Sequence, residues 1–133
     1  MTEGLKTQMD AQIRKCLQKV AETEAGVWGR FEFPENFIGF AGHFPDNPVL
    51  PGICKIKAGL IMLEQFYDAP VIIQEITRAK FFAPVSVGQP LNFRCREISA
   101  EGHRRVVTIN VTTRAEKKIA YLQLKFVLAN KGK

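Results

Sequence analysis

The sequence contains few of the residues that build disulfide frameworks and metal centres. Its 133 residues include 3 cysteines and 2 histidines. Cys16, Cys54 and Cys95 are odd in number, and their spacing matches no common set of metal ligands. We therefore expect reduced thiols in a cytoplasmic protein that binds no metal.

Long apolar runs and nucleotide-binding glycine patterns are also missing. No apolar run approaches the ~20 residues that cross a bilayer, and the first residues lack the basic start and apolar centre of a signal peptide. The glycine spacings of Rossmann folds and Walker loops do not occur. We expect no membrane contact and no cofactor.

The net charge of +6 is not concentrated in one tract. Basic residues are dispersed, and Arg104-Arg105 and Lys117-Lys118 are short pairs. This distribution does not predict nucleic-acid binding. An acidic protein partner would use the same positive field to speed its encounter with the chain.

The composition is that of an ordinary globular protein, with 46% hydrophobic and 24% charged residues. At this length we expect a single domain, residues 1–133, with one modest core. Apolar residues recur at helical spacing between Leu5 and Val20, which predicts an amphipathic helix over residues 4–23. Residues 27–33 alternate as in a strand, which Pro34 would end.

A stiff loop and an apolar helix are predicted in the middle of the chain. Residues 34–52 contain four prolines, each of which fixes a φ angle and removes a backbone donor. Residues 53–67 follow Gly52 and are apolar on nearly every face, which indicates a helix inside the core. Strands are predicted at residues 71–82, 91–98, 104–113 and 119–128. One buried helix enclosed by antiparallel strands is an α+β fold.

The loop and the start of this helix carry a specific motif. Residues 42–58 read GHFPDNPVLPGICKIKA, with the histidine, the phenylalanine, three prolines and two glycines in a distinctive order. This segment resembles the signature of hot-dog-fold 3-hydroxyacyl-[acyl-carrier-protein] dehydratases. Residues 76–88, ITRAKFFAPVSVG, resemble a later segment of the same family. The resemblance covers about residues 25–128, and the helix within residues 1–24 lies outside it.

The resemblance implies roles for three residues of the motif. His43 would be the base that removes a proton from C2 of the acyl thioester. Gly52 would bind the thioester carbonyl through its backbone N–H, at the positive end of the central helix. Lys57 stands where the family has a glutamate or aspartate. It would be an atypical acid or electrostatic residue opposite the partner subunit's histidine.

Two nearby carboxylates are weaker candidates for the missing acid. Glu64 lies two turns beyond Lys57, ~10 Å along the helix, and is better interpreted as a charge paired with a lysine or arginine. Asp46 is better interpreted as a support for the loop. Cys54 is interpreted as a buried bystander thiol, and His103 as a surface residue at a turn.

The resemblance also implies surfaces for the acyl chain and its carrier. Five residues are predicted to bind substrate: Phe44, Pro51, Ile53, Phe81 and Phe82. For Phe81 and Phe82 the alternative is that, at strand spacing, one faces the core and the other a subunit contact. Arg78 and Lys80 are predicted to contact the acidic carrier protein or its phosphopantetheine phosphate, and a solvated strand face is the alternative.

Three functions remain open at this stage. The first is a dehydratase-type enzyme acting on an acyl-carrier-protein or coenzyme A thioester in fatty-acid or polyketide-like synthesis. The second is a non-catalytic hot-dog subunit that binds acyl chains or forms a heterodimer with a related, active dehydratase. The third is an acyl thioesterase. The resemblance implies a homodimer or higher oligomer, because half of each site lies on each subunit.

Overall fold

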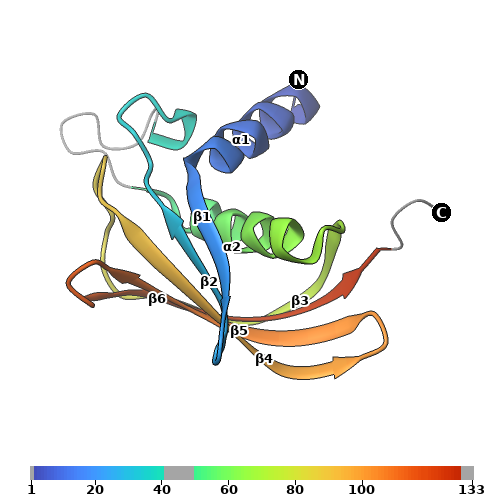
Figure 1. The fold of residues 1–133 in the computed structure, drawn as a ribbon. Coiled ribbons are helices and arrows are strands. Elements are labelled where there is room, and N and C mark those ends of the chain that lie inside the picture. The colour runs from blue at the N-terminus through green and yellow to red at the C-terminus, as the bar shows by residue number, and fades with distance from the viewer. Residues whose placement is uncertain (1, 41–49, 130–133) are drawn as a thin grey trace.

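The protein is a six-stranded antiparallel sheet curled around one long helix (Figure 1). The computed structural model describes residues 2–40 and 50–129, with side chains from residue 8 onwards. The strands are β1 (Leu17–Thr23), β2 (Gly26–Phe31), β3 (Val71–Phe81), β4 (Leu91–Glu101), β5 (Arg104–Thr113) and β6 (Lys118–Leu128). The helices are α1 (Thr2–Cys16), the short 3-10 helix η1 (Ile38–Phe40) and the central α2 (Gly52–Tyr67).

The strand order β1-β2-β4-β5-β6-β3 wraps the sheet around α2 and confirms the predicted hot-dog fold. α2 is buried along most of its length, as its lack of a polar face predicts. The inward residues of β6, among them Leu122, Leu124 and Phe126, are fully buried in the same core as α2. On β2, a Cβ at Gly29 would overlap the sulfur of Met62, so a larger residue there would require the Met62 side chain to shift.

The N-terminal segment differs from its prediction. The helix predicted over residues 4–23 ends at Cys16, and Leu17–Thr23 form the edge strand β1. β1 pairs with β2 through a hairpin whose turn includes Gly26 at a φ of 143°. The half-buried Leu17 and Val20 continue the helical spacing, so periodicity alone extends the helix. Pairing with β2 overrides this local preference.

The remaining elements lie close to their predicted ranges. β5 has the predicted bounds, β6 begins one residue earlier, and β4 continues to Glu101. α2 ends where Asp68 adopts a left-handed conformation with a φ of 54°, just before Pro70. Among the described residues, no helix has the length and apolar character needed to span a membrane.

α1 lies across the side of α2 that faces away from the sheet (Figure 1). Its apolar residues Ile13 and Cys16 are buried in the core. Gln12 of α1 accepts a hydrogen bond of 2.8 Å from the backbone N–H of Ile38 in η1. α1 therefore contacts both the central helix and η1, which lies within the predicted loop of residues 34–52.

Candidate active site

The first turn of α2 has no side-chain cap, so its properties depend on the backbone. Pro51, the N-cap residue, is extended, with a φ of −63° and a ψ of 150°, and it offers no side-chain cap to the helix. The N–H of Leu50 donates to the carbonyl of Val85 at 3.0 Å, which ties this turn to the segment after β3. The first N–H groups of a helix have no intrahelical acceptor and lie at its positive end. This turn can therefore bind an oxygen that carries negative charge.

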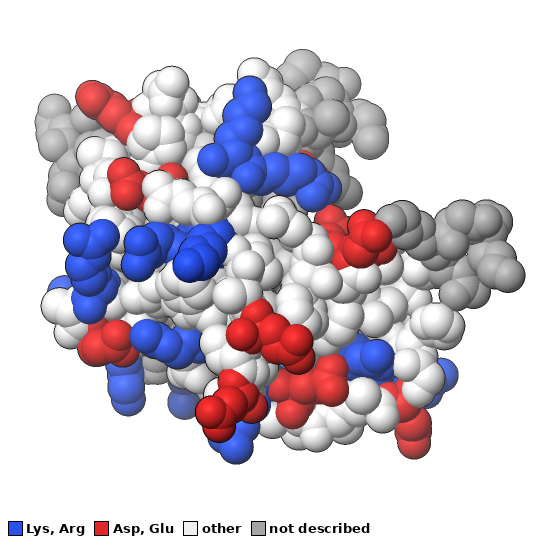
Figure 2. Space-filling model, viewed as in Figure 1, with Lys and Arg blue, Asp and Glu red and all other residues white. Residues whose placement is uncertain are grey.

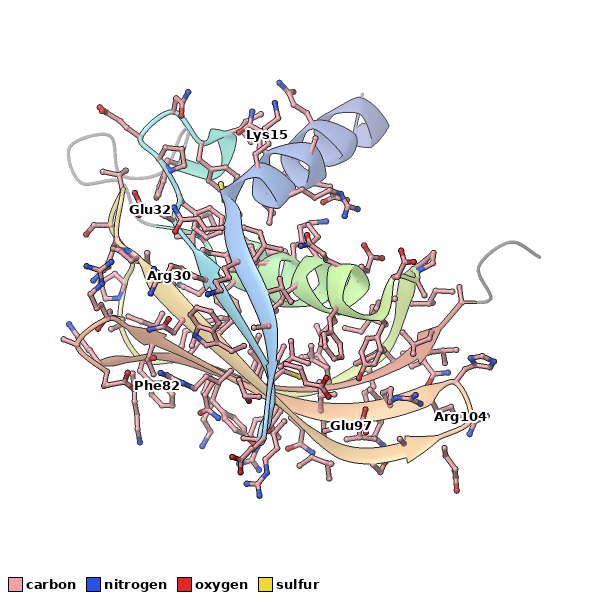
Figure 3. The ribbon with its side chains drawn as sticks, viewed as in Figure 1. Lys15, Arg30, Glu32, Phe82, Glu97 and Arg104 are labelled. Carbon is pink, nitrogen blue, oxygen red and sulfur yellow. The ribbon has the colours of Figure 1, made fainter. Side chains whose placement is uncertain are left out.

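The side chain of Phe81 covers this turn. A Cβ built on Gly52 would lie 3.0 Å from Cζ of Phe81, so a glycine lets the ring approach the helix. Ile53 and Phe81 are each about half exposed, which leaves apolar surface at the start of α2. Phe82 is also about half exposed, so neither phenylalanine lies in the core. The side chain of Phe82, just beyond β3, is labelled in Figure 3.

Lys55 is the most buried charged residue in the described parts of the chain, with 3% of its surface exposed. Its Nζ donates to the carbonyl of Leu50 at 3.2 Å and lies 5.3 Å from the centre of the Phe81 ring. Burial lowers the pKa of Lys55 below its ordinary value of 10.5. Lys55 thus stabilises the carbonyl before Pro51 by a hydrogen bond and contacts the ring beside Gly52.

Replacing Lys55 with methionine is expected to change how stability depends on pH. Because the pKa of Lys55 is lower in the folded protein, the unfolded chain binds more protons between the two pKa values. The free energy of unfolding of the wild type therefore rises, relative to Lys55→Met, as pH increases towards 10.5. Urea unfolding of both proteins at a series of pH values measures this difference.

The comparison between variants removes the effect of Cys16 and Cys95, but not that of Cys54, because the charge of Lys55 lowers the pKa of Cys54. Losing this charge raises the pKa of Cys54 further in Lys55→Met, which adds to the predicted difference in the same direction. Burial raises the pKa of Cys16 and Cys54 to about 11 and that of Cys95 to about 12. These thiols destabilise both proteins as pH rises above their unfolded value of about 9. Lys118→Met, on an exposed lysine, is the matched control and should follow the wild type. A constant difference between wild type and Lys55→Met would contradict the prediction.

Lys57 forms an ion pair with the N-terminal helix. Its Nζ lies 3.2 Å from Oδ1 of Asp10. The side chain of Lys57 is about three-quarters buried, and that of Asp10 about two-thirds. Glu64, further along α2, lies 3.3 Å from Nη2 of Arg14. Glu64 also accepts a hydrogen bond of 2.9 Å from the N–H of Val71. The interpretation of Glu64 as a paired structural charge is therefore confirmed.

His43, Phe44 and Asp46 fall outside the described residues. The structure brings together Gly52, Ile53 and Phe81 at the start of α2, with Pro51 as the N-cap residue. Lys57 lies more than one turn further along the same helix, beside α1.

The sequence of this chain matches the model of a known protein family. A sequence model of the ApeI-like family, described as ApeI dehydratase, matches residues 18–125. The chain belongs to the ApeI-like dehydratase family. The match runs from β1 into β6 and includes all of α2. It confirms the predicted resemblance and starts within β1, before the predicted residue 25.

Individual relatives agree with this assignment. The 3-hydroxyacyl-[acyl-carrier-protein] dehydratase FabZ of Clostridium novyi is 28% identical over 112 residues, covering 77% of this chain and 79% of that protein. The structure of the dehydratase heterocomplex ApeI:P from Xenorhabdus doucetiae has a TM-score of 0.71 at 17% identity, covering 84% of this chain and 96% of that chain.

A structure with a different name has nearly the same fold. A hypothetical thioesterase from Streptococcus pneumoniae, solved with coenzyme A, has a TM-score of 0.68 at 4% identity, covering 94% of this chain and 97% of that chain. At such low identity, structural similarity establishes the hot-dog fold alone.

In this ApeI-like protein, Cys54 is a buried thiol, and burial raises its pKa to about 11, which favours the protonated form at neutral pH. Its Sγ lies 3.9 Å from the sulfur of Met9 in α1. The predicted burial of Cys54 is confirmed. His103 is exposed at the turn between β4 and β5, as predicted.

Arg78 and Lys80 are exposed on β3, opposite Gln123 and Tyr121 of β6. Figure 2 shows basic side chains in separate groups on the viewed face, with acidic side chains between them.

In the described parts of the chain, no group of three or more His, Cys, Asp or Glu residues is placed to hold a metal ion.

Two other features lie away from the start of α2. Tyr67, the last residue of α2, donates a hydrogen bond of 2.9 Å to Glu97, and burial raises its pKa to about 12. A cleft of about 480 Å³ runs between α1 and residues 34–37 and contains none of the predicted site residues.

Sequence analysis missed Asp10 and Lys55. Both act through contacts that depend on how α1 and β3 pack against α2. One signal for Asp10 is present in the sequence. Asp10 precedes Arg14 on α1 as Lys57 precedes Glu64 on α2, so an acid followed by a base on one helix faces a base followed by an acid on the other.

Proposed function

We propose that the protein is a dehydratase-type enzyme that acts on 3-hydroxyacyl thioesters of an acyl carrier protein. The observation that carries this proposal is the family match over residues 18–125, which contains the whole motif at residues 42–58. The uncapped first turn of α2, covered by Phe81, supports it because it offers backbone N–H groups to a thioester oxygen.

The proposed reaction uses three groups. His43 removes the C2 proton, and the electron pair of that bond forms the double bond to C3. The N–H of Gly52 binds the thioester oxygen and stabilises the charge that develops there. The hydroxyl leaves C3 with a proton from Lys57, which gives water and the enoyl thioester. Lys57 replaces the carboxylate of the family as the proton donor.

The proposed acyl-binding surface consists of Phe44, Pro51, Ile53, Phe81 and Phe82. The exposure of Ile53, Phe81 and Phe82 supports this role, because burying such side chains against an acyl chain is favourable. Arg78 and Lys80 are proposed to contact the acidic carrier protein, in the cytoplasm, with a coenzyme A thioester as an alternative substrate. Their exposed positions on β3 leave them available for this contact.

The edge of β3 is the proposed subunit interface. β3 is 11 residues long and pairs with β6 at one edge, while Ile72, Ile73 and Ile76 are exposed on it. A long apolar edge strand offers unpaired backbone groups to another chain. Pairing of two β3 edges would join two sheets and bring two copies of the site together.

Ile76→Lys is expected to convert the dimer into a monomer with little remaining activity, because a charge on an edge strand opposes pairing. Sedimentation velocity measures the mass, and enoyl hydration measures the activity. Ile98→Lys is the matched control: Ile98 is 57% exposed on β4, whereas Ile76 is 44% exposed. An Ile76→Lys protein that stays dimeric and active would contradict this interface.

A heterodimer with a related dehydratase is the second candidate. The lysine at position 57 supports it, because a partner subunit with a carboxylate at this position would complete one site with His43. The ApeI:P heterocomplex is a dehydratase of similar fold made of different subunits. In this case, the chain alone would bind acyl thioesters without turning them over.

Thioester hydrolysis is the less favoured alternative. It needs a carboxylate base, for which Glu64 and Asp46 are the candidates. The carboxylate of Glu64 is already bound by Arg14 and the N–H of Val71, and Asp46 lies outside the described residues. Mass spectrometry of a 3-hydroxyacyl-acyl-carrier-protein incubated with the protein separates the three functions. Loss of one water supports dehydration, release of the free carrier thiol indicates hydrolysis, and an unchanged thioester favours the heterodimer.

A further inference from the structure

Two ion pairs join α1 to α2, and they have opposite polarity. Asp10 of α1 contacts Lys57 of α2 at 3.2 Å, and Arg14 of α1 contacts Glu64 of α2 at 3.3 Å. Each pair holds the same two helices together. The Asp10–Lys57 pair lies nearer the start of α2, and Asp10 and Lys57 are 32% and 24% exposed. The side chain of Arg14, in contrast, is 55% exposed.

Lys57 alone has only part of the chemistry of a carboxylic acid. A lysine ammonium has three hydrogen-bond donors and no acceptor, so it can protonate a hydroxyl but cannot accept a hydrogen bond from it. A carboxylate has two oxygens with about four acceptor positions. Oδ1 of Asp10 accepts one hydrogen bond from Lys57, so the carboxylate retains acceptor capacity beside the ammonium.

We propose that Asp10 and Lys57 form a two-residue acid, in which Asp10 supplies the acceptor that position 57 lacks. Asp10 orients the ammonium of Lys57 and accepts a hydrogen bond from the substrate hydroxyl. The N-terminal helix, outside the family match at residues 18–125, is then part of the active site. This inference rests on the proposed dehydratase function.

The protons balance over one turnover. His43 gains the C2 proton, and Lys57 gives one proton to the hydroxyl as the C3–O bond breaks, which releases water. The imidazolium then loses its proton to solvent, and the neutral amine of Lys57 takes one from solvent. Asp10 keeps its charge throughout, so no oxidant or further reactant is required.

Asp10→Asn distinguishes a catalytic role of Asp10 from a role that only holds α1 on α2. We expect kcat for enoyl-acyl-carrier-protein hydration to fall about 10–100-fold with little change in KM, a part of the ~10²–10⁴-fold typical of acid–base catalysis. Arg14→Gln is the matched control, because it removes the other α1–α2 ion pair, and it should retain kcat within about twofold. Asp10→Glu, which keeps the carboxylate, should recover most of the lost activity.

The possible outcomes separate this proposal from the proposed function. If Asp10→Asn is as active as Arg14→Gln, Asp10 only docks α1, whereas the dehydratase function stands. If the wild type is inactive but the double variant Asp10→Lys with Lys57→Glu turns over, the site is preserved and the two-residue acid is wrong. If the wild type and the double variant are both inactive, the two-residue acid and the homodimeric dehydratase function both fail.

Discussion

His43→Ala should lower the rate of enoyl-acyl-carrier-protein hydration by at least ~10²–10⁴-fold, the usual contribution of a general acid–base residue. The imidazole is the group in the motif whose ordinary pKa lies near neutral pH, so it can take and return a proton. The rate of loss of enoyl absorbance measures the effect. KM should change little, because His43 acts on the reacting carbon.

His103→Ala is the matched control for this variant. His103 is exposed at the turn between β4 and β5, and its backbone carbonyl, which accepts a hydrogen bond from Leu128, is unaffected by the substitution. It should retain wild-type activity. A His43→Ala protein with more than about a tenth of wild-type turnover would show that another group removes the C2 proton.

Gly52→Val should lower kcat/KM by ~10²–10³-fold, the usual effect of losing one oxyanion-hole donor. The cause is steric, because Gly52 does not have a positive φ and its backbone suits any residue. A Cβ there would lie 3.0 Å from Cζ of Phe81, and the two further methyl groups of valine would crowd the N–H that binds the thioester oxygen.

Gly52→Ala provides a graded comparison for the valine variant. Phe81 is 47% exposed, so its ring can move by a few tenths of an ångström to accept one methyl group. The alanine variant should therefore lose much less activity than the valine variant, and circular dichroism should show that both remain folded. Equal activity of wild type and Gly52→Val would rule out a role for this N–H.

Most of the fold could be predicted because the central helix and the strands have unambiguous patterns. The segment from Ile53 to Tyr67 is apolar on nearly every face, and it forms the buried α2. The alternation from Ala120 to Phe126 places one face of β6 in the core. Local sequence and tertiary packing favour the same structure in these segments.

The N-terminal segment could not be predicted correctly because two structures fit its pattern. Leu17 and Val20 continue the spacing of Ile13 and Cys16, and they are also the half-buried residues of a strand. The choice depends on pairing with β2, which is visible only in the folded chain. A long-range contact decides the structure here, and periodicity in a single segment does not contain that information.

Only part of the candidate site could be proposed from the sequence, because the rest also depends on long-range contacts. The motif assigned roles to His43, Gly52 and Lys57, because their order and spacing are specific. Asp10 is distant from Lys57 in the sequence and reaches it only because α1 packs on α2. The burial of Lys55 depends on Phe81 and on the turn at Leu50. Such contacts between elements far apart in the sequence cannot be read from the motif.

The most direct test of the proposed function is the hydration of a trans-2-enoyl-acyl-carrier-protein by the purified wild-type protein alone. A dehydratase catalyses this reverse reaction, so we expect the enoyl absorbance to fall at a rate proportional to protein concentration, without release of free thiol. Unchanged absorbance at high protein concentration, with a carrier protein that a known dehydratase turns over in parallel, would contradict the proposal that this chain is an active dehydratase.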